Sequence, residues 1–142
     1  MVTIAQIADW SADALTEPPI DWELLAAIAM TESSLDPQAV SPKGAKGLFQ
    51  FMPITVRDIT NRWNYPFDPF DPKASTKAAK LYLAWLMRKF PEDIHLVLAA
   101  WNWGYGNVQK WLRNEKEMPE ETQNFIEKVL KKYERMRDAD ET

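Results

Sequence analysis

The residue in this sequence best suited to proton transfer is Glu32, at the end of an apolar stretch. Leu25, Ile28 and Ala29 precede it at intervals that a helix places on one face with it. Since that face should pack into the core, the carboxyl is expected to be poorly solvated, which favours its protonated form. Such a group can donate a proton to a departing oxygen, as cleavage of a sugar linkage requires. The alternative is a Glu whose side chain turns out to water.

The composition limits the chemistry further. The chain has 142 residues, no Cys and one His, His95. Neither a disulfide, a thiolate nucleophile nor a His-rich metal site is expected, and no metal or organic cofactor is implied. Acidic residues outnumber basic ones by 21 to 17, for a formal net charge of −4, and no basic patch stands out. Nucleic acid is therefore not an expected partner.

The apolar spacing predicts helices along the whole chain and at most a short hairpin near 41–47. Asp71 and Pro72 are typical of a helix start, and Asp21 is expected to cap another helix. Leu15 is expected to face inward at the end of the first helix. The predicted fold is all-α, a single domain over 1–142 with about seven helices and a substrate cleft. The expected helices cover residues 3–15, 21–33, 53–62, 71–90, 92–103 and 108–112, with a last one that starts at 118–120 and continues through 133.

Aromatic residues make up 12% of the chain and fall into two groups. Trp22, Tyr82 and Trp85 lie in helical stripes and are expected in the core. A second group lies near Gly or loops, where ring faces and polar edges suit sugar rings. Its members are Trp63, Tyr65, Trp101, Trp103, Tyr105 and Trp111.

Four motifs follow one another in the chain. Glu32 is paired with Ser33, and residues 41–53 read S-P-K-G-A-K-G-L-F-Q-F-M-P. Residues 100–104 read A-W-N-W-G, and residues 118–122 read M-P-E-E-T before a further apolar helical stretch. Together, over about residues 20–133, they resemble the lytic transglycosylase family of the goose-type-lysozyme-like superfamily. The second motif is the most specific of the four.

The resemblance implies a lysozyme-like fold and an activity on peptidoglycan glycan strands. Members cleave the β-1,4 bond between N-acetylmuramic acid and N-acetylglucosamine without water and leave a 1,6-anhydromuramoyl end. One Glu serves as both acid and base, which would be Glu32 here. No second acid is an obvious partner: Asp36 precedes a Pro and suits a turn, and Glu121 suits the first turn of a helix.

The resemblance also implies a set of substrate-binding residues. Ser41 would hydrogen-bond near Glu32 or to the substrate, Gln50 and Met52 would line the cleft, and Asn102 would hold substrate or loop geometry. The full set is Ser41, Gln50, Met52, Trp101, Asn102, Trp103, Thr122 and Phe125. Three of these depart from the family pattern: Trp101 and Phe125 stand where the family has Tyr, and Trp103 stands where it has Ala. The first two changes remove phenolic hydroxyls, and the third alters the cleft wall.

Two other functions remain open at this stage. One is a lysozyme-type hydrolase on the same fold, and the other is a non-catalytic glycan-binding or virion module. The N-terminus has no signal-peptide pattern and no segment is long enough to span a membrane, so membrane insertion is not expected. The sequence favours a monomeric bacteriophage enzyme, made in the cytoplasm and acting on the cell wall as a holin-released endolysin or a virion-associated enzyme. The alternative is a trimmed domain of a bacterial periplasmic enzyme.

Overall fold

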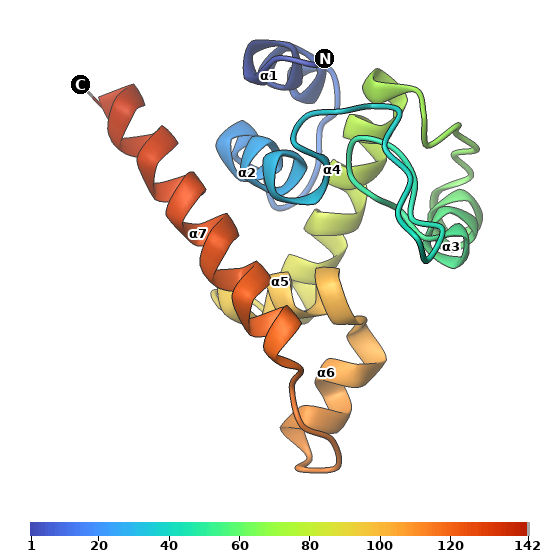
Figure 1. The fold of residues 1–142 in the computed structure, drawn as a ribbon, viewed down its shortest axis with the longest axis vertical. Coiled ribbons are helices and arrows are strands. Elements are labelled where there is room, and N and C mark those ends of the chain that lie inside the picture. Colours follow the sequence, from blue (N-terminus) through green and yellow to red (C-terminus); the bar gives the residue numbers. More distant parts are fainter. Residues whose placement is uncertain (142) are drawn as a thin grey trace.

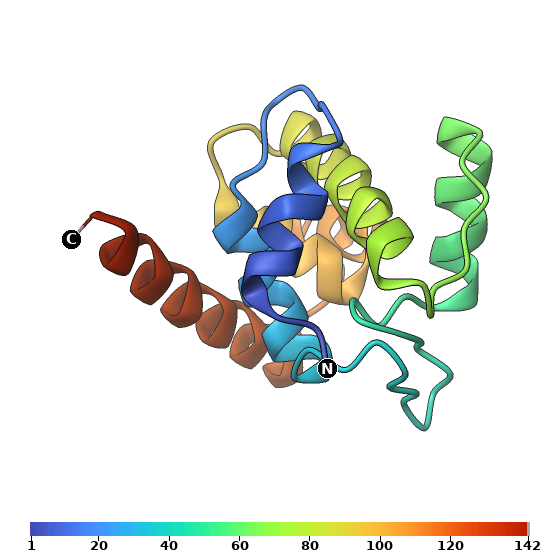
Figure 2. The same cartoon turned by 90° about the horizontal axis from the view of Figure 1, so that it is seen from above.

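A computed structural model describes the backbone of residues 1–141 and the side chains of residues 1–139. The described backbone forms seven helices. No strand occurs in the described part, and the all-α prediction is confirmed. Figures 1 and 2 show α7 and α3 on opposite sides of the other helices. The helices are α1 Ile4–Ala12, α2 Trp22–Ser33, α3 Pro53–Trp63, α4 Pro72–Lys89, α5 Ile94–Trp103, α6 Tyr105–Leu112 and α7 Glu120–Glu141.

Helix α2 lies at the centre of the core. Every residue from Leu24 to Ala29 is buried, which matches a helix that is apolar on all sides. Helices α1, α4 and α7 pack around it (Figure 1). This packing fixes the C-terminal turn of α2, and with it the position of Glu32.

The first helix ends earlier than the sequence predicted. It stops at Ala12, and Leu15 is 95% exposed, so the expectation that Leu15 faces inward is wrong. The reason is a contact from α4 that no local pattern encodes. The ammonium of the buried Lys80 donates hydrogen bonds of 2.6 Å to the carbonyl oxygens of Ser11 and Ala14. Lys80 therefore satisfies main-chain groups at the end of α1, where the chain turns away.

Of the two predicted helix caps, the one by Asp71 is confirmed and the one by Asp21 is wrong. The Asp71 carboxylate accepts hydrogen bonds from the amides of Lys73 and Ala74, so it caps α4 as predicted. Asp21 precedes α2 but makes no side-chain cap. Its carboxylate instead accepts a hydrogen bond from the Tyr133 hydroxyl of α7. The side chain of Asp21 therefore binds Tyr133, which is distant in the sequence, and does not cap the start of α2 as predicted.

The loop between α2 and α3 carries the longest sequence motif. Lys46 forms isolated antiparallel bridges with both Val40 and Phe51, so the expected hairpin is reduced to these two bridges. Ser33 Oγ donates a 2.7 Å hydrogen bond to the Leu48 carbonyl, which joins the loop to the end of α2. Gln50 Nε2 donates to the carbonyls of residues 39 and 47. We call residues 34–52 the motif loop.

Candidate active site

The side chain of Glu32 lines a cleft of about 260 Å³, which is formed by segments far apart in the sequence. The lining comes from the motif loop, the start of α3, the end of α5 and Tyr82 of α4. The lining residues are Glu32, Phe49, Gln50, Phe51, Met52, Ile54, Thr55, Tyr82, Trp101, Asn102, Trp103 and Gly104. Glu32 is the only acidic residue in this lining.

The carboxyl of Glu32 is a weak acid in this environment. Burial raises its pKa from 4.5 to about 7. The Trp101 indole N–H donates a 3.2 Å hydrogen bond to Glu32 Oε2, which opposes the rise, and the negative charge of Glu121 adds to it. Desolvation is the largest of these causes. Glu32 is therefore poised to hold a proton at neutral pH and to release it without a large cost.

Trp101 is fixed by aromatic rings around it. Its ring centroid lies 5.4 Å from that of Tyr82, 5.6 Å from Phe51 and 6.3 Å from Phe49. These neighbours come from α4 and the motif loop, on two sides of the indole. The packing fixes the direction in which the indole N–H points toward Glu32.

The structure brings five of the eight expected substrate-binding residues together with Glu32: Gln50, Met52, Trp101, Asn102 and Trp103. Ser41, Thr122 and Phe125 are outside this lining. Ser41 Oγ accepts a 3.0 Å hydrogen bond from the Ala45 amide, within the turn of the motif loop. Phe125 is a buried core residue.

Thr122 reaches the site through another residue. Its side chain is 1% exposed, and its hydroxyl donates a 2.8 Å hydrogen bond to Asn102 Oδ1. Since this bond occupies the amide oxygen, the amide nitrogen of Asn102 is directed by it and can donate toward the cleft. Thr122 is thus placed to orient Asn102.

Sequence reasoning placed Tyr82 in the core and missed it as a cleft residue. Its ring packs on Trp101, but the residue also lines the cleft. Burial raises the pKa of its hydroxyl to about 12, so the group stays protonated. The polar tip of a Tyr within an otherwise apolar stripe was the available signal.

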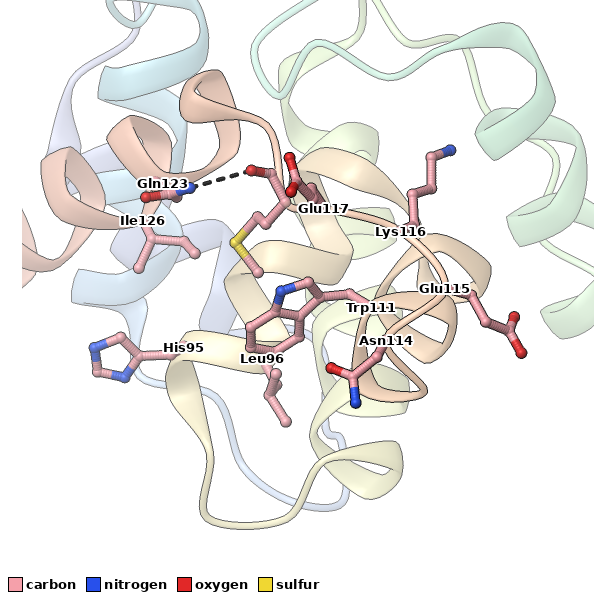
Figure 3. A pocket seen from close by; sticks show the side chains of 10 residues that line it. His95, Leu96, Trp111, Asn114, Glu115, Lys116, Glu117, Gln123 and Ile126 are labelled. Atoms are coloured by element: carbon pink, nitrogen blue, oxygen red, sulfur yellow. Dashed lines mark hydrogen bonds between the residues drawn. The ribbon is translucent and has the colours of Figure 1, made fainter.

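A larger cavity, of about 890 Å³, lies between α5, α6 and α7 (Figure 3). Trp111 and Leu96 lie near its centre, whereas Glu115 and Lys116 point away (Figure 3). Hydrogen bonds from Arg113 lower the pKa of the Glu115 carboxyl, the opposite of what a general acid needs. Glu32 in the smaller cleft is therefore the candidate acid.

The described residues show neither a metal-binding cluster nor a membrane-spanning helix. Among the side chains of residues 1–139, no group of three or more His, Cys, Asp or Glu is arranged to hold a metal ion. None of the described helices is both long and apolar enough to cross a bilayer.

The fold places the protein in the class of lysozyme-like helical domains. The 70-kDa soluble lytic transglycosylase of Escherichia coli superposes with a TM-score of 0.74 at 27% identity, over 89% of this chain and 22% of that one. A complex of the 70-kDa soluble lytic transglycosylase with bulgecin A gives a TM-score of 0.80 at 26% identity, over 91% of this chain and 24% of that one.

The family follows from the sequence comparison. The family described as the transglycosylase SLT domain matches residues 10–124, and the chain belongs to it. Membrane-bound lytic murein transglycosylase F 1 of Alkalilimnicola ehrlichii is 39% identical over 108 residues, which are 70% of this chain and 20% of the relative. The chain therefore spans about a fifth of the length of such relatives.

Proposed function

We propose that this domain is a peptidoglycan lytic transglycosylase that cleaves the β-1,4 bond between N-acetylmuramic acid and N-acetylglucosamine. The observation that carries the proposal is a single acidic side chain in the cleft, Glu32, with its pKa raised to about 7. Ordinary sugar hydrolases use two carboxyl groups, one of which attacks the sugar or activates water. The family membership and the names of the relatives support a reaction that needs only one.

The proposed reaction returns Glu32 to its starting state. Neutral Glu32 gives its proton to the glycosidic oxygen as the bond from that oxygen to muramoyl C1 breaks. The resulting carboxylate takes the proton of the muramoyl C6 hydroxyl, and O6 forms a new bond to C1. No water is consumed, and the product ends in a 1,6-anhydro ring. A pKa near 7 suits both steps, because the group is neither too weak an acid nor too weak a base.

The walls of the cleft suit a glycan strand. Trp103 and Tyr82 offer apolar ring surface with polar edges, and Asn102 offers an amide oriented by Thr122. Met52 is 38% exposed at the edge of the same cleft and adds flexible apolar contact.

Mass spectrometry of the soluble products from peptidoglycan sacculi tests the proposed function. Anhydro products are about 18 Da lighter than their reducing-end equivalents, because one water has not been added. Reducing-end products would instead identify a lysozyme-type hydrolase, and an absence of products from folded protein would favour a glycan-binding module.

The activity should depend on the protonation of Glu32. Since the first step needs the neutral carboxyl, kcat/KM is expected to fall as the pH rises through about 7. Initial rates on soluble glycan strands across about pH 3 to 9, a range that includes both the ordinary and the raised pKa, give the profile. An alkaline limb near pH 4.5, the ordinary value, would contradict the assignment of Glu32 as a buried acid.

The alkaline limb should move in Trp101→Phe. The indole N–H stabilises the carboxylate form, so its removal is expected to raise the pKa of Glu32 and shift the limb to higher pH. Trp103→Phe is the matched control, since the Trp103 indole makes no hydrogen bond to Glu32 in the described structure. Equal limbs in the two variants would show that the Trp101 bond does not set the acid strength.

The bacteriophage source, the release to the cell wall and the monomeric state stay predictions from the sequence. The same holds for the single domain over 1–142, because the matched residues cover only 20% of the relative.

A further inference from the structure

Trp103, at the edge of the cleft, is held by a side chain from the segment that joins α6 to α7. The Lys116 ammonium lies over the Trp103 ring, 5.5 Å from the ring centroid. The same ammonium donates a 2.8 Å hydrogen bond to Asn107 Oδ1, and Asn107 Nδ2 donates a 2.7 Å hydrogen bond to the Trp103 carbonyl. These three residues form a closed set of contacts, which we call the Trp103 clamp.

The direction of the Lys116 side chain is set by the Trp103 clamp. Lys116 belongs to a segment that lines the larger cavity, but its side chain points away from that cavity (Figure 3). The residue is exposed, and a long exposed side chain loses conformational entropy when two contacts fix it. The simplest alternative is that only the apolar stem of Lys116 covers the ring while the ammonium reaches water.

The ring of Trp103 is an addition to the family pattern, which has Ala at this position. Trp103 is the last residue of α5, and Gly104, with a φ of +106°, turns the chain into α6 directly after it. The side chain is half-buried and lines the cleft together with Glu32. Because Lys116 lies over one face of the ring, the surface left to a ligand is on the side of the cleft. An indole ring there suits the apolar face of a sugar.

We propose that Trp103 stacks on a sugar ring of the glycan strand and that Lys116 is the positioning residue that holds the indole for this contact. This rests on the proposed function and adds a specificity-determining contact to it. An indole that is fixed before the strand binds loses less conformational entropy on binding. The contact is remote from the proton transfer at Glu32, so its loss belongs in KM and not in kcat.

The first test replaces Lys116 by Met, which keeps an apolar stem and removes the ammonium. KM for soluble glycan strands is expected to rise about twofold to tenfold with kcat preserved, the range that ordering one side chain is worth. Lys116→Arg keeps a cation with hydrogen-bond donors and should restore the wild-type KM. Lys128→Met removes the same charge from an exposed position of α7 and should match wild type.

The second test asks whether Lys116 acts through the ring. Trp103→Leu removes the ring, keeps apolar bulk and is expected to raise KM about tenfold or more. Adding Lys116→Met to Trp103→Leu should then change KM no further. A wild-type KM for Lys116→Met alone would overturn the proposal and show that only the stem packs on the ring. Additive effects would also overturn it, because Lys116 would then contact the strand itself.

Direct binding separates this inference from the proposed function. In the Glu32→Gln background the strands are expected to bind without being cleaved, so titration calorimetry gives a Kd for each variant. The Kd values should rise in the same order as KM, and an unchanged Kd for Trp103→Leu would overturn the proposal. Anhydro products from wild type would then leave the proposed function intact. Reducing-end products would instead end the proposed function, while the Kd values still decided the role of Trp103.

Discussion

Replacing Glu32 by Gln is expected to lower kcat on peptidoglycan about a thousandfold while leaving the fold in place. The amide has the shape of the carboxyl, and its oxygen can still accept the hydrogen bond from the Trp101 indole. It cannot give a proton to the glycosidic oxygen or take one from the C6 hydroxyl, and no other acidic residue lines the cleft. The release of anhydro products by purified variant and wild type measures the loss.

The same variant should be more stable than wild type in alkaline solution. The folded state holds the proton of Glu32 more tightly than the unfolded chain does, because burial raises the pKa from 4.5 to about 7. The resulting stabilisation is complete below pH 4.5 and is lost as the pH rises through 7. Since the variant has no proton to lose, its advantage in unfolding free energy should grow to about 3 kcal/mol at pH 8.

Glu134→Gln, an exposed residue of α7, is the matched control for the change in charge. It should keep both the activity and the pH dependence of stability. If Glu32→Gln retained wall cleavage, the single-acid mechanism would be wrong. If its stability relative to wild type did not change between pH 4 and pH 8, about the range between the two pKa values, the carboxyl would be solvated and not buried.

Replacing Gly47 by Ala is expected to cost about 4 kcal/mol of unfolding free energy or more. Gly47 has a φ of +82°, and a Cβ there would lie 1.9 Å from the carbonyl oxygen of Pro69. That oxygen belongs to the main chain before α4, so it cannot swing aside as a side chain would. Either the motif loop or the segment before α4 must move. Urea unfolding measures the loss, and activity measures the effect on the cleft.

Gly44→Ala separates the cost of a positive φ from the cost of the contact with Pro69. Gly44 also has a positive φ, of +91°, but a Cβ there would meet nothing within 4 Å. Its substitution should therefore cost only the backbone strain, about 1–2 kcal/mol. Equal losses for the two variants would mean that the contact with Pro69 contributes nothing beyond the strain.

The sequence predicted the local features of this fold well. Asp71 with Pro72 marked the start of α4, and the apolar run before Glu32 marked a buried helix, because capping and periodicity are properties of short segments. The predictions were wrong where a residue distant in the sequence determines the local structure. Lys80 acts at the end of α1, and Tyr133 takes the carboxylate of Asp21.

In the candidate site, too, the local features were predicted and the contacts between distant residues were not. Glu32 stood out because an acid at the end of an apolar stripe is unusual in any fold. That the Trp101 indole donates to it across 69 positions, or that Thr122 holds Asn102, could not be derived from spacing. Tyr82 was placed in the core since its stripe reads as core, and only the tertiary structure, in which Tyr82 packs on Trp101 and lines the cleft with residues of the motif loop, shows it to be a cleft residue.

The burial of the motif loop determines how the domain is expected to unfold on heating. It is held by the hydrogen bond from Ser33 Oγ to the Leu48 carbonyl, by two bridges at Lys46, and by Leu48, Phe49 and Phe51, whose side chains are buried in the core. Because its release would expose these apolar side chains, we expect the loop to open together with the core around α2 and not before it. Opening admits water to Glu32, and the pKa of a rehydrated carboxyl returns toward 4.5. At neutral pH, the proton of Glu32 and the packing of the core are therefore expected to be lost in the same thermal transition.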